Sequence, residues 1–378
     1  LTCSGARSGE ARVWSFFSKV TSIPDFQRQF QPYASGWQLA QRMPLHVPVK
    51  DKLTVKDLMM HMRDHYEGSI LNMTEDVGSG AWAAKFRDRP LTWTYGGDHY
   101  VNERSIGTQQ SAWHFVANMR PWLPNHIGGV FWFGVDDATF SVHIPFYARC
   151  EVPKALRTGT GSIVDVDFEA LFWLNDLVAN KVYSKWEIIA PVVSAAVAAF
   201  EDEFFARQSL VEDEALRLWN LGQASPESLG GATAGAWRGG ERESAIAIEM
   251  SASHLSRYSN VLTGRVAAQW LKLWQHLSVT FRDGVMILPP TPGHDHGGKQ
   301  MGGAVANMLD GSGSGNGQWR DTWKKAIVEE TGDHLKGKGG DHVADMHKVQ
   351  VMEGKCRNAA TTRRVAEAAR SNLLNIVA

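Results

Sequence analysis

The sequence has little cysteine and almost no net charge. Its 378 residues include three cysteines, Cys3, Cys150 and Cys356, which cannot all pair with one another and show no metal-type spacing. This usage gives no disulfide framework and is typical of a reducing compartment, although the compartment itself stays open. The formal net charge is −1 and the isoelectric point about 7.0, so electrostatics favour neither nucleic acid nor an anionic membrane as a partner.

Long apolar runs are also absent. The most apolar helical stretch, IIAPVVSAAVAAF, is interrupted by Pro191 and followed by EDE, and it is shorter than the roughly 18 residues that a membrane span requires. The opening LTCSGARSGEARVW lacks the apolar centre of a signal peptide. We therefore expect no transmembrane helix. Because the first residue is Leu1 rather than Met, we interpret the chain as a piece, either a processed product or part of a larger protein.

Stand-alone catalytic motifs are missing as well. The sequence contains no GxSxG, HExxH or GxGxxG pattern. What it does contain is a globular composition, with 43% hydrophobic and 21% charged residues. The 15 tryptophans often stand in apolar runs such as VFWFGV and ALFWL, which indicates a bulky core.

The first third of the chain has helical spacing. Apolar residues recur along EARVWSFFSKV, residues 10–20, and along the helix expected after Thr54. Thr54 and Asp57 form a variant of the capping box, and Gly68 is placed to end that helix in a left-handed conformation. Residues 91–148 then predict a β-meander of at least four strands, including a hairpin around GGD, in a sheet covered on both faces.

The remainder is predominantly helical. We expect helices from Asp165 to about Leu221, separated near Pro191, and another over 244–281. The predicted organisation is a domain over 1–285, a Pro/Gly/Ser/His-rich linker over 286–318 and a helical extension over 319–378.

Two polar stretches could carry chemistry. The first is MRDHYEGS, with Arg63, Asp64 and His65; on composition alone a solvated helix end is the favoured interpretation, although histidine is a ready acid or base and arginine binds carboxylates. The second is YVNERSIGTQQSAWHF, with Asn102, Arg104 and Gln109. Its polar residues lie between aromatic runs, so they form either a satisfied structural network or a polar pocket at the strand ends.

Weaker candidates lie elsewhere. The loop residues His294, Asp295 and His296 could bind a metal, but they lack a fourth ligand at a known spacing, and a solvated loop is favoured. Asn72 begins a glycosylation sequon that matters only in a secreted protein. Cys3 is the third residue and leads into a helix, so we interpret it as structural.

Several motifs, taken in order, resemble the N-terminal-nucleophile cysteine dipeptidases, a family that includes dipeptidase A and the secernins. The resemblance covers about residues 5–285 and corresponds to the C-terminal two-thirds of the family's domain, with a looser match at WKKAIVEETGDHLK. The motifs that carry it are EARVWSFF, MRDHYEGS, YVNERSIGTQQSAWHFVANMRPWLP, GGVFWFGVDDATFSVHIPFY and FWLNDLVANKVYSKW.

The resemblance implies an α+β fold, an αββα sandwich of the N-terminal-nucleophile hydrolase type, here with added C-terminal helices. It implies hydrolysis of dipeptides or short peptides through an acyl-enzyme on a cysteine thiolate, without cofactor or metal. By resemblance, Arg63, Asp64 and His65 would organise the pocket. Asn102, Arg104 and Gln109 would contact the substrate or the oxyanion; some relatives carry an arginine at the position of Gly107.

The sequence departs from the family pattern at its beginning, because the segment bearing the nucleophilic cysteine is not among these residues. One explanation is an associated N-terminal chain that carries the cysteine. The other is a non-catalytic family member that serves as a scaffold subunit of a larger assembly. A metal-dependent hydrolase using the histidine-rich loop is a third, weaker alternative.

Overall fold

The computed structural model describes residues 2–157, 159, 161–224, 245–282 and 319–336, with the backbone of four two-residue strands. These strands form two antiparallel pairs: Trp237–Arg238 (β6) with Glu241–Arg242 (β7), and Met286–Ile287 (β8) with Val305–Ala306 (β9). Within this part of the chain, helices are combined with small antiparallel sheets, which agrees with the predicted α+β class.

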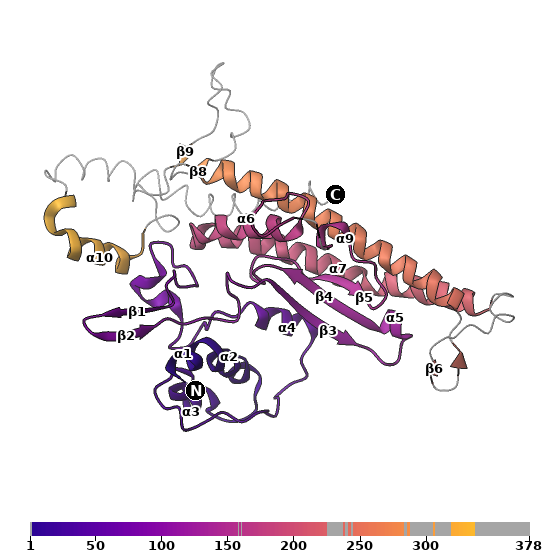
Figure 1. Ribbon diagram of the computed structural model, residues 1–378, viewed down its shortest axis with the longest axis horizontal. Helices are drawn as coiled ribbons and strands as arrows, with labels where there is room; N and C mark the ends of the chain where they lie inside the picture. Colours follow the sequence, from indigo (N-terminus) through magenta and orange to yellow (C-terminus); the bar gives the residue numbers. More distant parts are fainter. Residues whose placement is uncertain are drawn as a thin grey trace, which may run out of the picture.

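A three-stranded antiparallel sheet lies at the centre of the molecule (Figure 1). Its strands are Trp113–Met119 (β3), Gly129–Val135 (β4) and Ile144–Tyr147 (β5), in the order β3-β4-β5. The short helix Asn125–Gly128 (α5) connects β3 to β4. Residues alternate between buried and more exposed along β3, because successive side chains of a strand point to opposite faces.

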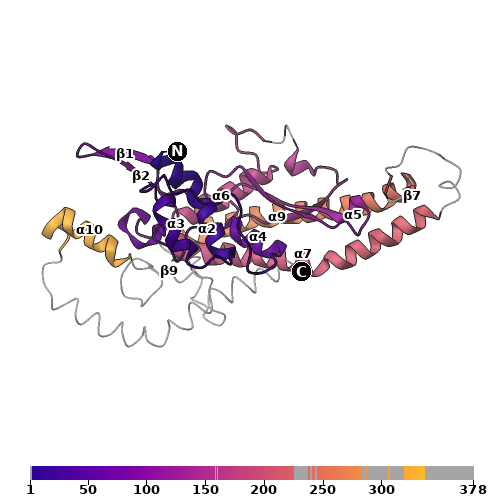
Figure 2. The same ribbon diagram turned by 90° about the horizontal axis from the view of Figure 1, so that it is seen from below.

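Three helices cover one face of this sheet (Figures 1 and 2). They are Leu171–Tyr183 (α6), Trp186–Gln223 (α7) and Ala245–Thr280 (α9). The fully buried Trp132 of β4 stacks on Phe205 of α7, with ring centroids 4.3 Å apart. The buried Trp270 of α9 donates a hydrogen bond from its indole Nε1 to the Phe140 carbonyl, at 3.3 Å. Aromatic side chains therefore form much of the main core, as the tryptophan count predicted.

The long helices α7 and α9 run side by side and approach closely at Gly222. A Cβ atom at Gly222 would lie 2.4 Å from the Cα atom of Ala247, closer than any side chain allows. Glycine is therefore required for the two backbones to approach at this end of the helix pair.

The opposite face of the sheet carries aromatic side chains. Their rings form a continuous ladder, with centroid separations of 5.7 Å for Trp113–Phe115, 4.5 Å for Phe115–Phe131, 5.6 Å for Phe131–Phe133 and 6.3 Å for Phe133–Phe146. Trp113 is 58% exposed and Phe131 is 38% exposed. We call these five residues, together with the 73% exposed Met119, the aromatic face. The expectation of a sheet covered on both faces is wrong for the described residues.

The N-terminal residues form a second apolar core. Cys3–Gly5 (α1), the π-helical segment Ala6–Glu10 and Ala11–Val20 (α2) form consecutive helical turns, and Phe26–Ala34 (α3) packs against them. Trp14 is fully buried here and donates a hydrogen bond from its indole Nε1 to the Gln27 carbonyl, at 2.9 Å. The helix predicted over 10–20 is confirmed.

Helix α4, Val55–Met62, leads from this second core to the sheet. It begins with the predicted capping box, in which Thr54 and Asp57 bond reciprocally. Gly68 is left-handed as predicted, with φ of 73°, but the helix ends six residues earlier, at Met62. The reason is local: the carboxylate of Asp64 accepts the backbone N–H of Tyr66 at 3.1 Å, which forms a turn in competition with the helix.

Two further sequence expectations need correction. The strands of 91–148 do not form one meander, because Thr92–Tyr95 (β1) and Asp98–Val101 (β2) pair only with each other, around the predicted glycine turn. Pro191 lies inside α7 and does not separate two helices; the break falls at Ser184 and Lys185. The buried Ile189 and Val193 on either side of Pro191 hold the helix together despite the lost hydrogen bond.

The last described element, Asp321–Thr331 (α10) followed by the 3₁₀ turn Gly332–Leu335, agrees with the helical piece predicted near 318–335. Arg320 attaches it to the rest of the chain by donating to the carbonyls of Asp76 and Thr74 and to the hydroxyl of Ser79. The helix predicted near 359–376 and most of the predicted linker 286–318 lie outside the described residues. The domain boundaries therefore stay a prediction.

Candidate functional site

Three segments that are distant in the sequence meet at the turn after α4. The Gly107 backbone N–H donates to the Asp64 carbonyl at 3.0 Å, and the Tyr66 hydroxyl donates to the Arg104 carbonyl at 2.7 Å. His65 reaches the third segment, where its Nε2 atom lies 3.1 Å from the hydroxyl of Thr139. Both polar stretches singled out in the sequence therefore lie against each other.

Asp64 connects this turn to helix α2. Its carboxylate is almost fully buried and accepts hydrogen bonds from the Ser15 hydroxyl and the Lys19 ammonium group. A buried carboxylate is stable only when it is paired and hydrogen-bonded, and here both conditions hold. Asp64 thus fixes the turn on the N-terminal core and does not face an open site.

His65 is oriented by a carboxylate. Its ring is 4% exposed, packs edge-on against Trp186 at 5.4 Å between centroids, and places Nδ1 3.4 Å from Glu67. Glu67 also accepts from Lys85 at 2.8 Å. Burial raises the pKa of Glu67, but the bonds from His65 and Lys85 outweigh burial and hold that pKa far below its ordinary value. Glu67 is therefore ionised and fixes the imidazole.

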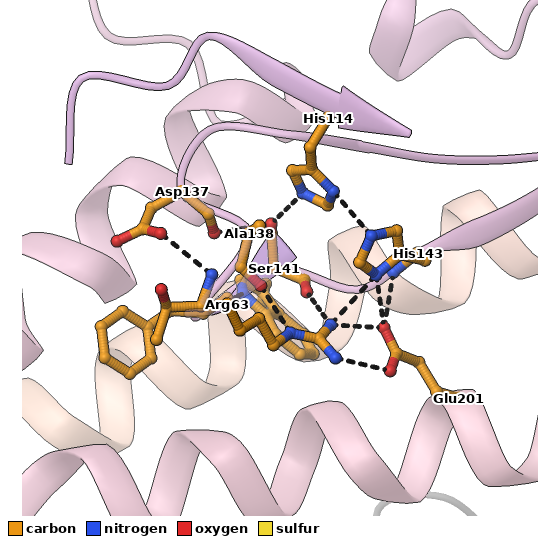
Figure 3. A network of polar contacts seen from close by, with 10 residues as sticks. Arg63, His114, Asp137, Ala138, Ser141, His143 and Glu201 are labelled. Atoms are coloured by element: carbon orange, nitrogen blue, oxygen red, sulfur yellow. Dashed lines mark hydrogen bonds and ion pairs between the residues drawn. The ribbon is translucent and has the colours of Figure 1, made fainter. Parts of the chain in front are cut away.

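Arg63 belongs to a separate buried network between the sheet and α7 (Figure 3). Its guanidinium group donates to Glu201 at 3.0 and 2.6 Å, to the Ala138 carbonyl at 2.7 Å and to the Ser141 carbonyl at 3.1 Å. His143 lies 2.9 Å from Glu201 and continues the network to His114, also at 2.9 Å.

The electrostatics of this network indicate a structural role. Burial raises the pKa of Glu201, but its bonds to His143 and Arg63 outweigh burial and hold the pKa at about 2. Burial lowers the pKa of His114 and of His143 below the ordinary value. The network thus combines one ion pair with two neutral histidines, enclosed between a strand layer and a helix.

A small hollow, open to solvent on one side, lies beside the meeting point of the three segments. Arg104 and Gln109 line it, as do Thr108 and Gln110, which are joined by a 2.9 Å hydrogen bond. The other lining residues are Met73, Phe86, Arg87, Leu91, Glu103 and Ser105. The hollow thus combines apolar walls with convergent polar groups, and its enclosed space is about that of one water molecule.

The charges around the hollow are unevenly compensated. Arg87 is paired with Asp76 at 2.6 Å and with Glu103 at 3.0 Å. Arg104 forms no ion pair with any residue that the structure describes, and neither does its neighbour Arg12, whose Nε donates to the Arg104 carbonyl at 3.2 Å. The site therefore has an excess of positive charge.

Asn102 lies at the base of the β1-β2 hairpin. Its amide donates to the Pro90 carbonyl at 3.3 Å and accepts from the Trp93 indole at 3.4 Å. It does not line the hollow. Of the six sequence candidates, Arg104 and Gln109 thus line the hollow. His65 and Asp64 lie beside it. Arg63 and Asn102 lie in other networks.

Sequence reasoning missed Arg12, Ser15 and Lys19, which reach the site from α2. Their spacing of three and four residues puts them on one helix face, so a polar stripe in EARVWSFFSKV was the available signal. Glu201 gave no such signal, because a short acidic run such as EDE within a long amphipathic helix is ordinarily a solvated face, and a lone histidine such as His143 beside a strand is equally ordinary.

Neither described cysteine has an obvious activating base. The Cys3 thiol lies 4.0 Å from the Ser35 carbonyl, and the Cys150 thiol contacts the Glu151 and Ser256 carbonyls. Over the part of the chain that the structure describes, no group of three His, Cys, Asp or Glu residues could hold a metal ion. The candidate ligands His294, Asp295 and His296 lie outside those residues.

Among the described helices, none has both the length and the apolar character required to cross a membrane. Comparison with the curated proteins gives no match. Comparison with protein-family models does give one: the model of peptidase family C69 matches residues 4–198, just over half of the chain. That span includes α2, the 63–68 turn, the polar stretch 100–116 and the entire three-stranded sheet. The chain therefore belongs to peptidase family C69, the dipeptidase A and secernin-like family of cysteine peptidases.

Proposed function

We propose that this chain is the larger part of a cysteine exopeptidase that hydrolyses dipeptides or short peptides with a free amino end. The match to peptidase family C69 over residues 4–198 carries the proposal. The nucleophile would be a cysteine at the start of a segment outside residues 1–378. Neither Cys3 nor Cys150 has surroundings suited to that role, which supports this placement.

The proposed reaction proceeds in two steps. A cysteine thiolate attacks the carbonyl carbon of the scissile peptide bond, and the leaving amine takes a proton as the acyl-enzyme forms. Water then attacks the thioester, which releases the acid product and regenerates the thiol. Polar side chains at the hollow, of which Arg104 and Gln109 are the best placed, would contact the substrate, while His65 and Asp64 hold the surrounding turn.

The aromatic face supports an associated N-terminal chain as the partner. Large exposed apolar patches on a sheet mark interaction surfaces, and a second sheet on this face would complete the αββα sandwich. Each edge strand, β3 and β5, also has one free side within the described residues. The nucleophile-bearing segment would thus occupy the exposed side of the sheet.

Intact-mass and N-terminal analysis of the native protein tests this proposal. We expect a second polypeptide that begins with cysteine to co-purify with the chain, or the same segment to precede it covalently. The preparation should hydrolyse dipeptides such as L-alanyl-L-alanine, and alkylation of the N-terminal thiol by iodoacetamide should abolish that activity. A native preparation without any such cysteine would overturn the catalytic proposal.

The second candidate is a non-catalytic family member that acts as a scaffold subunit. The aromatic face favours it equally, since that surface requires a protein partner whether or not the partner carries a nucleophile. Dipeptide hydrolysis separates the two candidates. A native complex that retains its partner but hydrolyses no dipeptide would support the scaffold function.

A further inference from the structure

A chain of four close contacts runs through the buried network between the sheet and α7 (Figure 3). It begins at the carbonyl of Asp137, which lies 2.8 Å from the Ser141 hydroxyl, and continues from that hydroxyl to His114 Nε2 at 2.6 Å. His114 Nδ1 lies 2.9 Å from His143 Nε2, and His143 Nδ1 lies 2.9 Å from Glu201. All four distances are those of hydrogen bonds.

Both ends of this chain can only accept a hydrogen bond. A carbonyl oxygen carries no proton, and neither does an ionised carboxylate. Glu201 is ionised, because its bonds to His143 and Arg63 outweigh burial and hold its pKa at about 2. The four contacts therefore require four protons, and these must come from the groups in between, which are the Ser141 hydroxyl and the two imidazole rings.

With both histidines neutral, the chain is one proton short. A hydroxyl carries one proton and a neutral imidazole carries one, which gives three protons for four contacts. Burial lowers the pKa of His114 and of His143, so both rings are neutral at neutral pH. One of the four contacts is therefore unfilled, and the two atoms there face each other with lone pairs.

The place of the unfilled contact follows from the strength of the acceptors. The carboxylate of Glu201 is the strongest acceptor in the chain because it is ionised, and so it takes the Nδ1 proton of His143. His143 Nε2 must then accept from His114 Nδ1, and His114 Nε2 must accept from the Ser141 hydroxyl. Both rings are thus Nδ1-protonated tautomers, and the unfilled contact is that between Ser141 and the Asp137 carbonyl.

The surrounding charged groups limit how many protons the rings can take up. Arg63 Nη2 lies 2.6 Å from Glu201 and 3.1 Å from His143 Nδ1, and both nitrogens direct their protons at the same carboxylate. The carboxylate of Asp137 is engaged elsewhere, by the Tyr183 hydroxyl at 2.8 Å. Arg63 already places one positive charge beside the two rings, and repulsion opposes two more.

We propose that these groups form a proton-operated switch, in which the two histidines take up one shared proton in mild acid and the Ser141 hydroxyl changes its partner. The added proton comes from solvent and binds at His114 Nε2, which then donates to the Ser141 oxygen. The Ser141 hydroxyl rotates and donates its own proton to the Asp137 carbonyl. All four contacts are then filled, and one imidazolium charge belongs to the pair of rings.

The switch acts on a loop that borders the candidate site. In mild acid the hydroxyl of Ser141 closes the loop 137–141 by its bond to the Asp137 carbonyl, and at neutral pH the loop lacks that bond. Thr139 lies within this loop, and its hydroxyl is 3.1 Å from His65 Nε2. Proton uptake in the buried network therefore tightens the loop that contacts His65. This inference does not depend on the proposed peptidase function.

Nitrogen NMR of the full chain with isotope-labelled histidine tests the switch, because nitrogen shifts distinguish the two tautomers and the imidazolium. Scalar coupling across the N–H···N bond identifies His114 and His143 in the wild-type protein. At about pH 7.5 we expect both rings to be Nδ1-protonated. As the pH is lowered over the range in which circular dichroism shows the chain folded, the pair should take up one proton. An Nε2-protonated ring at neutral pH, or uptake of no proton or of two, would overturn the inference.

Ser141→Ala removes the acceptor of the added N–H group. The midpoint of proton uptake by the pair should fall by about one pH unit or more, because the imidazolium loses a hydrogen bond to its charged form. The tautomers at neutral pH should not change. An unchanged midpoint in the folded variant contradicts the inference, and if the variant does not fold, the wild-type measurement decides alone.

Ser251→Ala is the matched control. Ser251 is also fully buried, lies 2.6 Å from His126 Nε2 and donates to the Ala247 carbonyl at 2.6 Å, so it has the same kinds of partner as Ser141. It lies outside the chain of four contacts, and its replacement should leave the midpoint of the pair unchanged. An equal decrease in both serine variants would show a general loss of packing and would count against the switch.

Discussion

Arg63 and Glu201 form a two-bonded ion pair across the boundary between the end of α4 and the middle of α7. The guanidinium nitrogens Nη1 and Nη2 donate to the two carboxylate oxygens at 3.0 and 2.6 Å, and 138 residues separate the partners in sequence. The same carboxylate also accepts the backbone N–H of His143 at 2.9 Å. This single pair therefore joins the candidate-site turn, the residue that precedes strand β5 and the helical layer.

Replacing Glu201 tests the importance of that junction. Glu201→Gln should lower the free energy of unfolding by about 3–5 kcal/mol, because it leaves a largely buried arginine without its counter-charge. Urea denaturation measures the change. The exposed pair Lys154–Glu169 provides the control, and Glu169→Gln should leave the free energy of unfolding nearly unchanged, because solvent screens exposed ion pairs. A similar small loss for both variants would contradict a structural role for Arg63.

The histidines of this network make stability depend on pH. Burial lowers the pKa of His114 and of His143, so below about pH 6.5 the unfolded chain binds more protons than the folded one. The contribution of these two histidines to the free energy of unfolding should be fully present above about pH 6.5. It should decrease as the pH falls below that value. Urea midpoints measured from pH 7.5 to 4.5 test this. His114→Gln should flatten the decrease, whereas substitution of the exposed His99 should not.

Substitution of the aromatic face should affect partner binding more than folding. Trp113→Ser should lower binding of a hydrophobic dye and retention of any co-purifying polypeptide, while the unfolding free energy changes by less than about 1 kcal/mol. Size-exclusion chromatography with light scattering and chemical denaturation give the two measurements. Trp132→Ala, on the buried face of the same sheet, should instead cost about 3–5 kcal/mol. Unchanged partner retention in Trp113→Ser would count against the aromatic face as the binding surface.

The close approach of α7 and α9 predicts opposite effects for two glycines. Gly222→Ala should destabilise the protein by about 1–3 kcal/mol, because the new methyl group would overlap the backbone of Ala247. Gly264→Ala, within α9 and without any neighbour inside 4 Å, should stabilise it by up to about 1 kcal/mol through helix propensity alone. Thermal denaturation of both variants distinguishes packing from propensity. Equal effects of the same sign would rule out the proposed overlap.

Local features of this fold could be predicted from the sequence, and long-range pairing could not. The capping box of Thr54 and Asp57 and the glycine turn between β1 and β2 depend on residues a few positions apart, and both are confirmed. The division of five strands into separate sheets depends on contacts that no local pattern encodes. The continuity of α7 through Pro191 likewise follows from the burial of its neighbours, which overrides the local preference.

For the candidate site too, the local segments could be predicted from the sequence, whereas the long-range contacts of their side chains could not. The family motifs include 63–68 and 100–116, and these two stretches lie together in the structure. The sequence did not indicate that Arg63 turns toward Glu201 or that Asp64 turns toward Lys19, because side chains next to each other in a turn point in different directions. Arg12 gave no signal of its own, because helical periodicity marks the apolar face of a helix and not the polar one.

The described residues form two separate apolar cores, one built around Trp14 and the other around Trp132 and Trp270. The turn 63–66 and the segment 104–108 run between them and are held largely by hydrogen bonds and ion pairs. Cooperative units in proteins often separate where apolar contacts are fewest. We therefore expect amide hydrogen exchange to resolve two protection classes whose boundary falls at these residues. The hollow beside Arg104 lies at that boundary, so a molecule bound there would slow exchange in both classes at once.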